Sequence, residues 1–171
     1  MTKQFESLRI ACRNPSIKDE LTSLLTERSR SVGVELKWGL RRVPLSRGRH
    51  HGGYVCAFRC QPLLRVESAL ERHVLRALAA DQGCVALATQ PVTIQWTWRG
   101  TVRRYTPDVL AMLCELPPSW RALGLDRLSM IEVKPARFSV DDDLWVERVR
   151  IIQHVLGMPL IRLSTLPEAL S

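Results

Sequence analysis

The 171-residue sequence lacks any long hydrophobic run and any recognisable leader segment. A membrane-spanning helix needs about 20 consecutive apolar residues, and no stretch of the chain approaches that length. The first residues, MTKQFESLRIACRN, do not contain the basic region followed by an apolar region that marks a signal peptide. We therefore expect a cytoplasmic protein with no membrane partner.

Cysteine is also too scarce and too scattered to form a disulfide framework, because the chain has five cysteines at irregular spacing. Cys56 and Cys60 lie near His50 and His51, which raises the question of a zinc site. The spacing does not match paired zinc ligands, and no second cysteine pair follows. Zinc is therefore the less favoured interpretation of this segment.

Acidic residues are absent from 36 to 66, within a chain whose formal net charge is +8. This glycine-interrupted segment carries seven basic residues: Lys37, Arg41, Arg42, Arg47, Arg49, Arg59 and Arg65. Uncompensated basic side chains attract the phosphate backbone of nucleic acids. We expect this segment to contact nucleic acid, and a merely solvated basic surface is the alternative.

The hydrophobic pattern predicts an α/β fold in which helices flank a mixed sheet. A first helix is expected over 17–29, capped by Asn14 or Ser16, and no internal repeat is present. The core order α-β-β-β-α-β then follows from a helix over 68–80, strands over 92–98, 103–114 and 128–134, a helix over 141–156 and a strand over 158–163. We expect an N-terminal helical arm with basic loop over 1–40 and a catalytic domain over 41–171.

The strand expected over 128–134 carries the first candidate site residues. Alternation places Glu132 and Lys134 on one face, with Ile131 and Val133 on the other. A carboxylate there can bind a divalent cation, and the ammonium can orient or help deprotonate an attacking water. A glutamate and a lysine two residues apart also occur in surface strands, so an exposed ion pair is the alternative.

Two further carboxylates are expected near that strand. Asp108 follows Pro107 and opens an apolar run, which places an acid at the mouth of a buried strand, although a turn aspartate is the alternative. On the helix over 68–80, Glu71 falls inside the apolar arc, and so does Glu67. A carboxylate directed at a core is costly unless a partner such as a metal compensates it. A glutamate at the edge of the arc is the other interpretation.

These acids, in this order, resemble the PD-(D/E)xK nuclease superfamily. More narrowly, the chain is similar to the catalytic domain of TnsA-type transposase endonucleases over about 41–163. The resemblance rests on the joint occurrence of five segments, namely RRVPLSRGRHHGG, ESALERHVLRAL, TQPVTIQW, RGTVRRYTPDVL and MIEVKP. Some members have glutamine where this chain has Glu132.

The resemblance implies a restriction-endonuclease-like fold and a DNA endonuclease that cuts phosphodiester bonds at transposon ends. Its cofactor would be Mg²⁺, with Mn²⁺ able to substitute. Its site would consist of catalytic Glu71, Asp108, Glu132 and Lys134, metal ligands Glu71, Asp108, Glu132 and the Val133 carbonyl, and Glu67 as the substitute for Glu71. DNA contacts would come from Arg41, Arg42, Arg47, Arg49, Gln90, Arg103 and Arg104. For Gln90, a backbone-pairing role before Pro91 is an equal alternative.

The same resemblance implies partners and a location. They are double-stranded DNA, a TnsB-like DDE transposase and a TnsC-like AAA+ ATPase, in a bacterial cytoplasm close to the nucleoid. TnsA proteins usually continue into a C-terminal helical domain that contacts TnsC, whereas this sequence stops at Ser171, so the ATPase is the less supported partner. A standalone nuclease of repair or restriction, and a non-catalytic DNA-binding assembly module, are the competing functions.

Overall fold

In the computed structural model the described residues are 5, 7–29, 33–39, 52–136, 138 and 142–166. Several sequence-based expectations concern other parts of the chain. Four of the expected DNA-contacting arginines (Arg41, Arg42, Arg47 and Arg49), together with His50 and His51, lie outside the described residues. The expected domain boundary between 40 and 41 also lies there.

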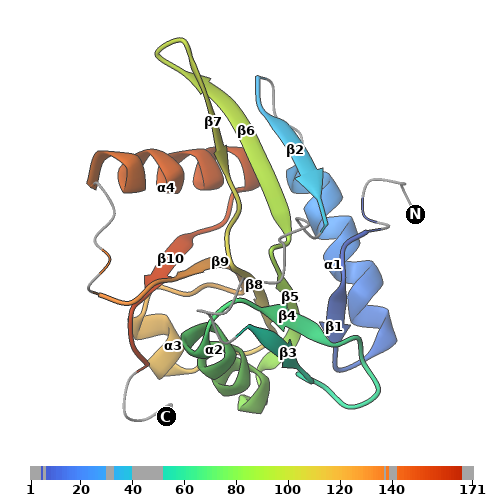
Figure 1. The fold of residues 1–171 in the computed structure, drawn as a ribbon. Coiled ribbons are helices and arrows are strands. Elements are labelled where there is room, and N and C mark those ends of the chain that lie inside the picture. Colours follow the sequence, from blue (N-terminus) through green and yellow to red (C-terminus); the bar gives the residue numbers. More distant parts are fainter. Residues whose placement is uncertain are drawn as a thin grey trace.

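A five-stranded mixed sheet forms the centre of the molecule, in the order β1-β5-β8-β9-β10. Its strands are β1 (Ile10–Cys12), β5 (Cys84–Thr89), β8 (Val109–Leu113), β9 (Leu128–Val133) and β10 (Leu160–Leu163). Neighbouring strands are antiparallel except for β9 and β10, which pair in parallel with Glu132 opposite Arg162. The strands β5, β8 and β9 are buried along their whole length, because helices cover both faces of the sheet (Figure 1).

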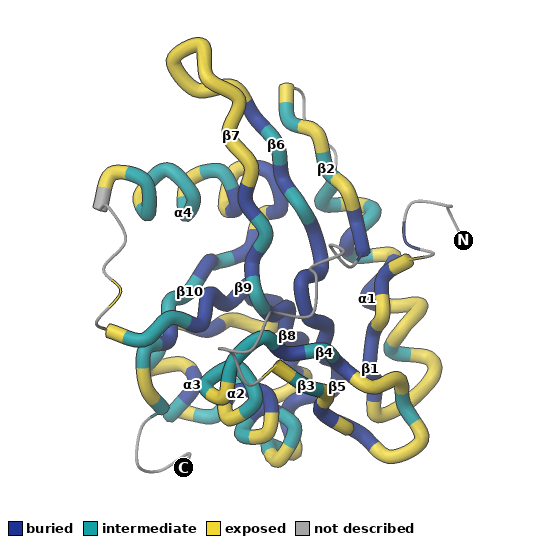
Figure 2. Tube along the Cα trace, viewed as in Figure 1, coloured by how far each residue is buried: buried dark blue, intermediate teal, exposed yellow. Residues whose placement is uncertain are grey.

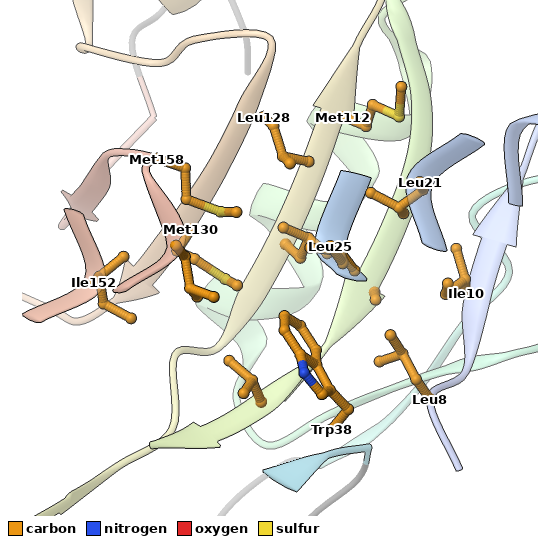
Figure 3. Packing of buried hydrophobic residues seen from close by; sticks show 14 of the residues in the cluster. Leu8, Ile10, Leu21, Leu25, Trp38, Met112, Leu128, Met130, Ile152 and Met158 are labelled. Atoms are coloured by element: carbon orange, nitrogen blue, oxygen red, sulfur yellow. The ribbon is translucent and has the colours of Figure 1, made fainter. Parts of the chain in front are cut away.

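The helices lie in two layers, one on each face of the central sheet. They are α1 (Pro15–Arg28), α2 (Ala69–Ala80), α3 (Pro118–Ala122) and α4 (Asp142–Leu156). Leu21 of α1 and Ile152 of α4 pack in one hydrophobic cluster with Met130 of β9, as Figure 3 shows. On the other face, α2 and α3 pack against the side chains of β9 that alternate with Met130. The chain therefore folds as an α/β protein with helix, sheet and helix layers.

Two smaller sheets extend the structure. One has the order β2-β6-β7, formed by β2 (Glu35–Trp38), β6 (Val92–Trp98) and β7 (Thr101–Tyr105), and the other pairs β3 (Gly53–Val55) with β4 (Leu64–Val66). The β6–β7 hairpin projects away from the central sheet beside α4 (Figure 1), and its tip is exposed (Figure 2). At the tip, Arg99 and Gly100 adopt positive φ angles of 46° and 77°, which a two-residue turn between twisted strands requires.

The N-terminal segment is built into the same core. β1 pairs with β5 at one edge of the central sheet, and Leu21 and Leu25 of α1 are fully buried. The helix begins after Asn14, whose side chain accepts a hydrogen bond from the Ser16 N–H at 3.1 Å, as capping residues do. No helix among the described residues combines the length and apolar character of a membrane span.

The helices α1, α2 and α4 follow the sequence-based prediction, but the strands differ from it. The strands β1, β2, β3 and β4 were not predicted, and two further differences concern the central sheet. The single strand expected over 103–114 is wrong, because β7 and β8 belong to different sheets. Pro107 lies between them, where its missing N–H prevents a continuous ladder. β5 was not predicted, because its six residues are all buried and an apolar run of this kind carries no alternation to mark it as a strand.

Candidate active site

Asp108 lies where β8 begins, directly beside the end of β9. Its backbone N–H donates to the Ile131 carbonyl at 3.1 Å, which extends the pairing of β8 and β9 by one residue. Its carboxylate Oδ2 accepts a hydrogen bond from the Val133 N–H at 2.7 Å. These two bonds hold Asp108 against the end of β9, the strand that carries Glu132 and is followed by Lys134.

The environment of Asp108 opposes its negative charge. Burial is the largest cause that raises its pKa, to about 8, and the charge of Glu132 is the second. The hydrogen bond from Val133 acts in the opposite direction, while Glu71 and Glu67 raise the pKa further. The four carboxylates therefore belong to one electrostatic group, in which anionic charge is under-compensated.

Glu132 lies on the α4 face of the sheet and is 7% exposed. Its Oε2 accepts a hydrogen bond from the Tyr105 hydroxyl at 2.7 Å, and its Oε1 lies 3.8 Å from Nη1 of Arg148. The Arg148 guanidinium stacks on the Tyr105 ring at 4.4 Å. Burial and the Glu132 charge raise the Tyr105 pKa far above its usual range, so Tyr105 remains a neutral donor.

Glu71 occupies the first turn of α2, where it completes the N-terminal cap of the helix. The Ser68 hydroxyl accepts a hydrogen bond from the Glu71 N–H at 3.1 Å. In return the Glu71 carboxylate accepts bonds from the Ser68 hydroxyl and the Glu67 N–H, each at 2.9 Å. Burial raises the Glu71 pKa despite these bonds, and the charges of Glu67 and Glu132 add to the rise. Glu71 thus has a structural role in the cap and lies within electrostatic reach of Glu132.

Gln90 follows β5 and connects this strand to the group of carboxylates. Its N–H donates to the Asp108 carbonyl at 2.8 Å, which is the backbone-pairing role considered for it. Its side-chain amide donates to the Glu67 carboxylate, and the residue is 8% exposed with a positive φ of 46°. Its side chain therefore lies among the acids rather than on an outer face of the protein.

Lys134 follows β9 immediately, on the same side as Glu132 by strand alternation. Its N–H donates to the Leu163 carbonyl at 3.0 Å, which fixes its backbone against β10. The residue is half-buried, and no carboxylate of the described residues lies within the 4.0 Å of its ammonium that defines an ion pair. The amine is therefore available to a phosphate or a water molecule.

The carboxylates of the candidate site are not arranged in the geometry of a metal-binding site. Within the described parts of the chain, no group of three or more His, Cys, Asp and Glu side chains has the geometry to hold a metal ion. Glu71 and Glu132 approach the same end of the sheet from opposite faces, because α2 packs on the side of Val133 and α4 on the side of Met130. The donor chemistry nevertheless suits a hard divalent cation, since carboxylate and backbone carbonyl oxygens are its preferred ligands.

The remaining expected DNA contacts within the described residues lie on the projecting hairpin. Arg103 and Arg104 of β7 are both exposed. Nε of Arg104 donates to the side-chain Oε1 of Gln95 at 2.6 Å, and Nε2 of Gln95 donates to the Glu35 carboxylate of β2 at 3.2 Å. The hairpin therefore presents positive charge on a surface supported by three strands.

Two neighbours of Glu132 were missed at the sequence level. The sequence pattern assigns no role to Tyr105, and it predicts only that Arg148 lies in a helix. A signal for Arg148 existed, because it falls on the arc of α4 defined by Ile152 and Val155, which are buried. An arginine on a buried arc calls for an anionic partner, and Glu132 is that partner.

No protein-family model matches the sequence. No curated protein matches it either.

Proposed function

We propose that this protein is a metal-dependent DNA endonuclease that cuts phosphodiester bonds at transposon ends as the TnsA-like subunit of a heteromeric transposase. The observation that carries the proposal is the 2.7 Å hydrogen bond from the Val133 N–H to the Asp108 carboxylate, which holds this acid at the strand segment between Glu132 and Lys134. Burial and the charges of Glu132, Glu71 and Glu67 raise the pKa of Asp108 in addition. Groups of carboxylates that oppose one another's ionisation at the end of a sheet are typical of functional sites. A divalent cation would supply the positive charge that this group of carboxylates lacks.

The fold is consistent with a restriction-endonuclease-like arrangement. The order α2, β5, β8, β9, α4, β10 is the α-β-β-β-α-β core expected for that class. Asp108 directly precedes the second core strand, Glu132 lies near the end of the third, and Lys134 follows the third strand. This supports the proposal at the level of chain order and residue placement.

Asp108, Glu132, Glu71 and the Val133 carbonyl would hold the cation. The N–H and C=O of a strand residue point to the same side, so the Val133 carbonyl is directed towards the Asp108 edge. When bound, Mg²⁺ neutralises charge on the scissile phosphate and lowers the pKa of a coordinated water. For Glu71 to take part, its carboxylate must leave its cap on Ser68 and Glu67.

Lys134 would position the attacking water and the phosphate, because its ammonium has no carboxylate partner among the described residues. Tyr105 holds Oε2 of Glu132 by donating its hydroxyl proton, which leaves Oε1 directed at Arg148. The exposed Arg103 and Arg104 would contact the DNA backbone at a distance from the cut.

The test is a cleavage assay on transposon-end duplex with Mg²⁺ or Mn²⁺ and the transposase partner. Asp108→Ala and Lys134→Ala should each abolish cutting while circular dichroism shows an unchanged fold. Asp19→Ala, an exposed acid on α1, is the matched control and should cut as wild type does. Wild-type activity in Asp108→Ala would overturn the proposal.

A second readout needs no transposase. Isothermal titration of Mn²⁺ should show binding to wild type and to Asp19→Ala, and none to Asp108→Ala. Cutting of plain duplex by the protein alone would favour a standalone nuclease. Metal binding without any cutting in the complete assembly would favour a non-catalytic assembly module.

A further inference from the structure

The tip of the β6–β7 hairpin exposes an aromatic ring to solvent. Trp98, the last residue of β6, is 41% exposed, whereas Trp96 on the same strand is 5% exposed. Val102, which follows the turn on β7, is 57% exposed. Figure 2 shows that this tip stands clear of the buried parts of the molecule. The Trp98 ring is therefore open to a ligand, and covering it would remove a large apolar surface from water.

The strand register fixes the side of the hairpin on which Trp98 lies. Trp98, Trp96 and Tyr105 share one face, because opposed residues of antiparallel strands and alternate residues of one strand do so. On that face Trp96 Nε1 donates to Glu147 of α4, and the Tyr105 hydroxyl donates to Glu132, each at 2.7 Å. Tyr105 lies four residues along β7 from the partner of Trp98, a distance of about 13 Å at about 3.3 Å per residue. Trp98 therefore lies on the side that carries the candidate site, about four duplex base steps from it.

Positive charge accompanies the exposed ring. The Arg99 guanidinium lies over the Trp98 ring, 5.6 Å from its centroid. The segment 97–105 carries no acidic residue and three exposed arginines, which are Arg99, Arg103 and Arg104. Within the described part of the chain, Arg99 has no ion-pair partner. The tip therefore combines an aromatic face with uncompensated positive charge.

Two carboxylates do contact the hairpin, both at its stem. Glu147 accepts the hydrogen bond of Trp96, and Glu35 accepts one from Gln95 at 3.2 Å. The Lys37 ammonium lies 3.7 Å from Glu35, so the charge of Glu35 is already offset. These acids reduce the positive charge of the stem and make no printed contact with the tip.

A nucleobase is the ligand that matches this combination. Its flat π surface stacks on an aromatic side chain, and the phosphates on either side of it are attracted to arginine. Inside a duplex the neighbouring base pairs cover both faces of each base. The Trp98 ring can therefore stack on a base only where that base is unpaired or unstacked.

We propose that Trp98 stacks on an unpaired DNA base beside the site of cleavage, with Arg99 on the adjoining phosphate. The inference rests on the proposed function for the identity of the polymer. It adds a preference for DNA in which a base near the cut is unpaired. The stem of the hairpin contacts the backbone through charge, and the tip contacts the base through its aromatic ring.

The preference can be measured by fluorescence anisotropy with two labelled duplexes, one fully paired and one with a single bulged thymine, and with Ca²⁺ in place of Mg²⁺. Wild type should bind the bulged duplex about 5- to 100-fold more tightly. Trp98→Leu keeps an apolar side chain without a π face and should bind both duplexes equally, whereas Trp98→Phe should retain most of the preference. Val102→Ala, which shortens the other exposed apolar side chain of the tip, is the matched control and should retain all of it.

Salt dependence separates stacking from charge. Stacking neutralises no phosphate, so the slope of log K against log salt should be the same in wild type and Trp98→Leu. Arg99→Gln should lower this slope by about 0.9, the value for one phosphate contact. Because its side chain is exposed, Trp98→Leu should melt close to the wild-type temperature.

Tryptophan fluorescence reports the stacked ring directly. Trp38, Trp96 and Trp120 are at most 5% exposed, and Trp145 is half-buried. The bulged duplex should therefore quench the fluorescence of wild type through Trp98. The quench should disappear in Trp98→Phe and persist in Trp145→Phe.

The outcomes separate this inference from the proposed function. If wild type cuts transposon-end DNA but binds the two duplexes equally, stacking is refuted and the nuclease stands. If preference and quench both depend on Trp98 while the complete assembly never cuts, stacking stands and the nuclease is refuted. A preference that survives in Trp98→Leu would also refute stacking. Unquenched wild-type fluorescence at saturating bulged duplex would refute it too, and would leave the exposed tip to a protein partner.

Discussion

The Asp108 carboxylate accepts a hydrogen bond from the Val133 N–H at 2.7 Å, across the end of two paired strands. The bond ties the acid of one strand to the backbone between Glu132 and Lys134. It also leaves Asp108 beside a carboxylate whose charge opposes its own.

The stability of the metal-free protein should fall as the pH rises from about 4 to 8. The folded pKa of Asp108, about 8, is raised above its ordinary value of 3.8. The folded state therefore holds a proton that the unfolded state releases over this range, so its contribution to stability is full below pH 4 and is lost as pH passes 8. Between pH 5 and 8.5 the melting temperature of Asp108→Asn should therefore fall less than that of wild type, by about 2–4 °C or more.

Asp19→Asn, on the exposed side of α1, is the control and should retain the wild-type slope. Saturating Mn²⁺ should flatten the slope in wild type, because bound metal replaces the proton. An unchanged slope in Asp108→Asn would show that another group is responsible for it.

The two roles of Glu71 should separate in two substitutions. Glu71→Ala removes the acceptor for Ser68 and for the Glu67 N–H, and should cost about 0.5–2 kcal/mol in urea unfolding, as loss of a helix cap does. Glu71→Gln keeps an acceptor oxygen and removes the charge, so stability should stay close to wild type. If Glu71 binds metal, Glu71→Gln should weaken Mn²⁺ binding in spite of its intact cap.

Equal metal affinity in wild type and Glu71→Gln would limit Glu71 to its structural role. The corresponding test of Glu67→Gln then shows whether the neighbouring acid is the ligand.

Tyr105→Phe should destabilise the protein by about 1–3 kcal/mol, because it leaves a buried charged acceptor with one hydrogen bond fewer. The lost bond is the 2.7 Å contact to Glu132. Tyr54→Phe, at a tyrosine that is 54% exposed, should change the unfolding free energy little. Urea unfolding measures both, and equal values for the two variants would contradict the assigned role of Tyr105.

The projecting hairpin should contribute to DNA affinity through charge. Arg103→Gln should lower the salt slope of duplex binding by about 0.9, the value for one phosphate contact. Arg121→Gln, an exposed arginine of α3 on the opposite face, is the control. Anisotropy titrations at several salt concentrations measure both, and a slope that is equally unaffected in the two variants would remove Arg103 from the DNA surface.

The helices could be predicted from the sequence because their signals are local. Asn14 caps α1, and Ser68 with Glu71 caps α2, as the spacing of these residues indicates. The strands were less predictable, because a fully buried strand such as β5 has no polar face to show its period. Its omission caused the hairpin strand β6 to be taken as the first strand of the core.

The candidate site shows the same division. Alternation along β9 was sufficient to place Glu132 and Val133 on opposite faces of the sheet. Two other contacts depend on how distant segments pack. Helix α4 brings Arg148 to Glu132, and the Gln90 side chain turns inward to Glu67. Sequence spacing carries no information about such contacts.

The sequence by itself determined the helix positions, the polarity of the strand faces and the order in which the acids occur, because each depends on residues within one or two turns of chain. Only the tertiary structure decided which strands are neighbours, which arginines face Glu132 and how far the carboxylates oppose one another's charge. Those properties arise from burial and from distances between segments that are far apart in the chain, such as Asp108 and its neighbours on α2 and β9. They exist only once the sheet has formed and water has been excluded from its two faces.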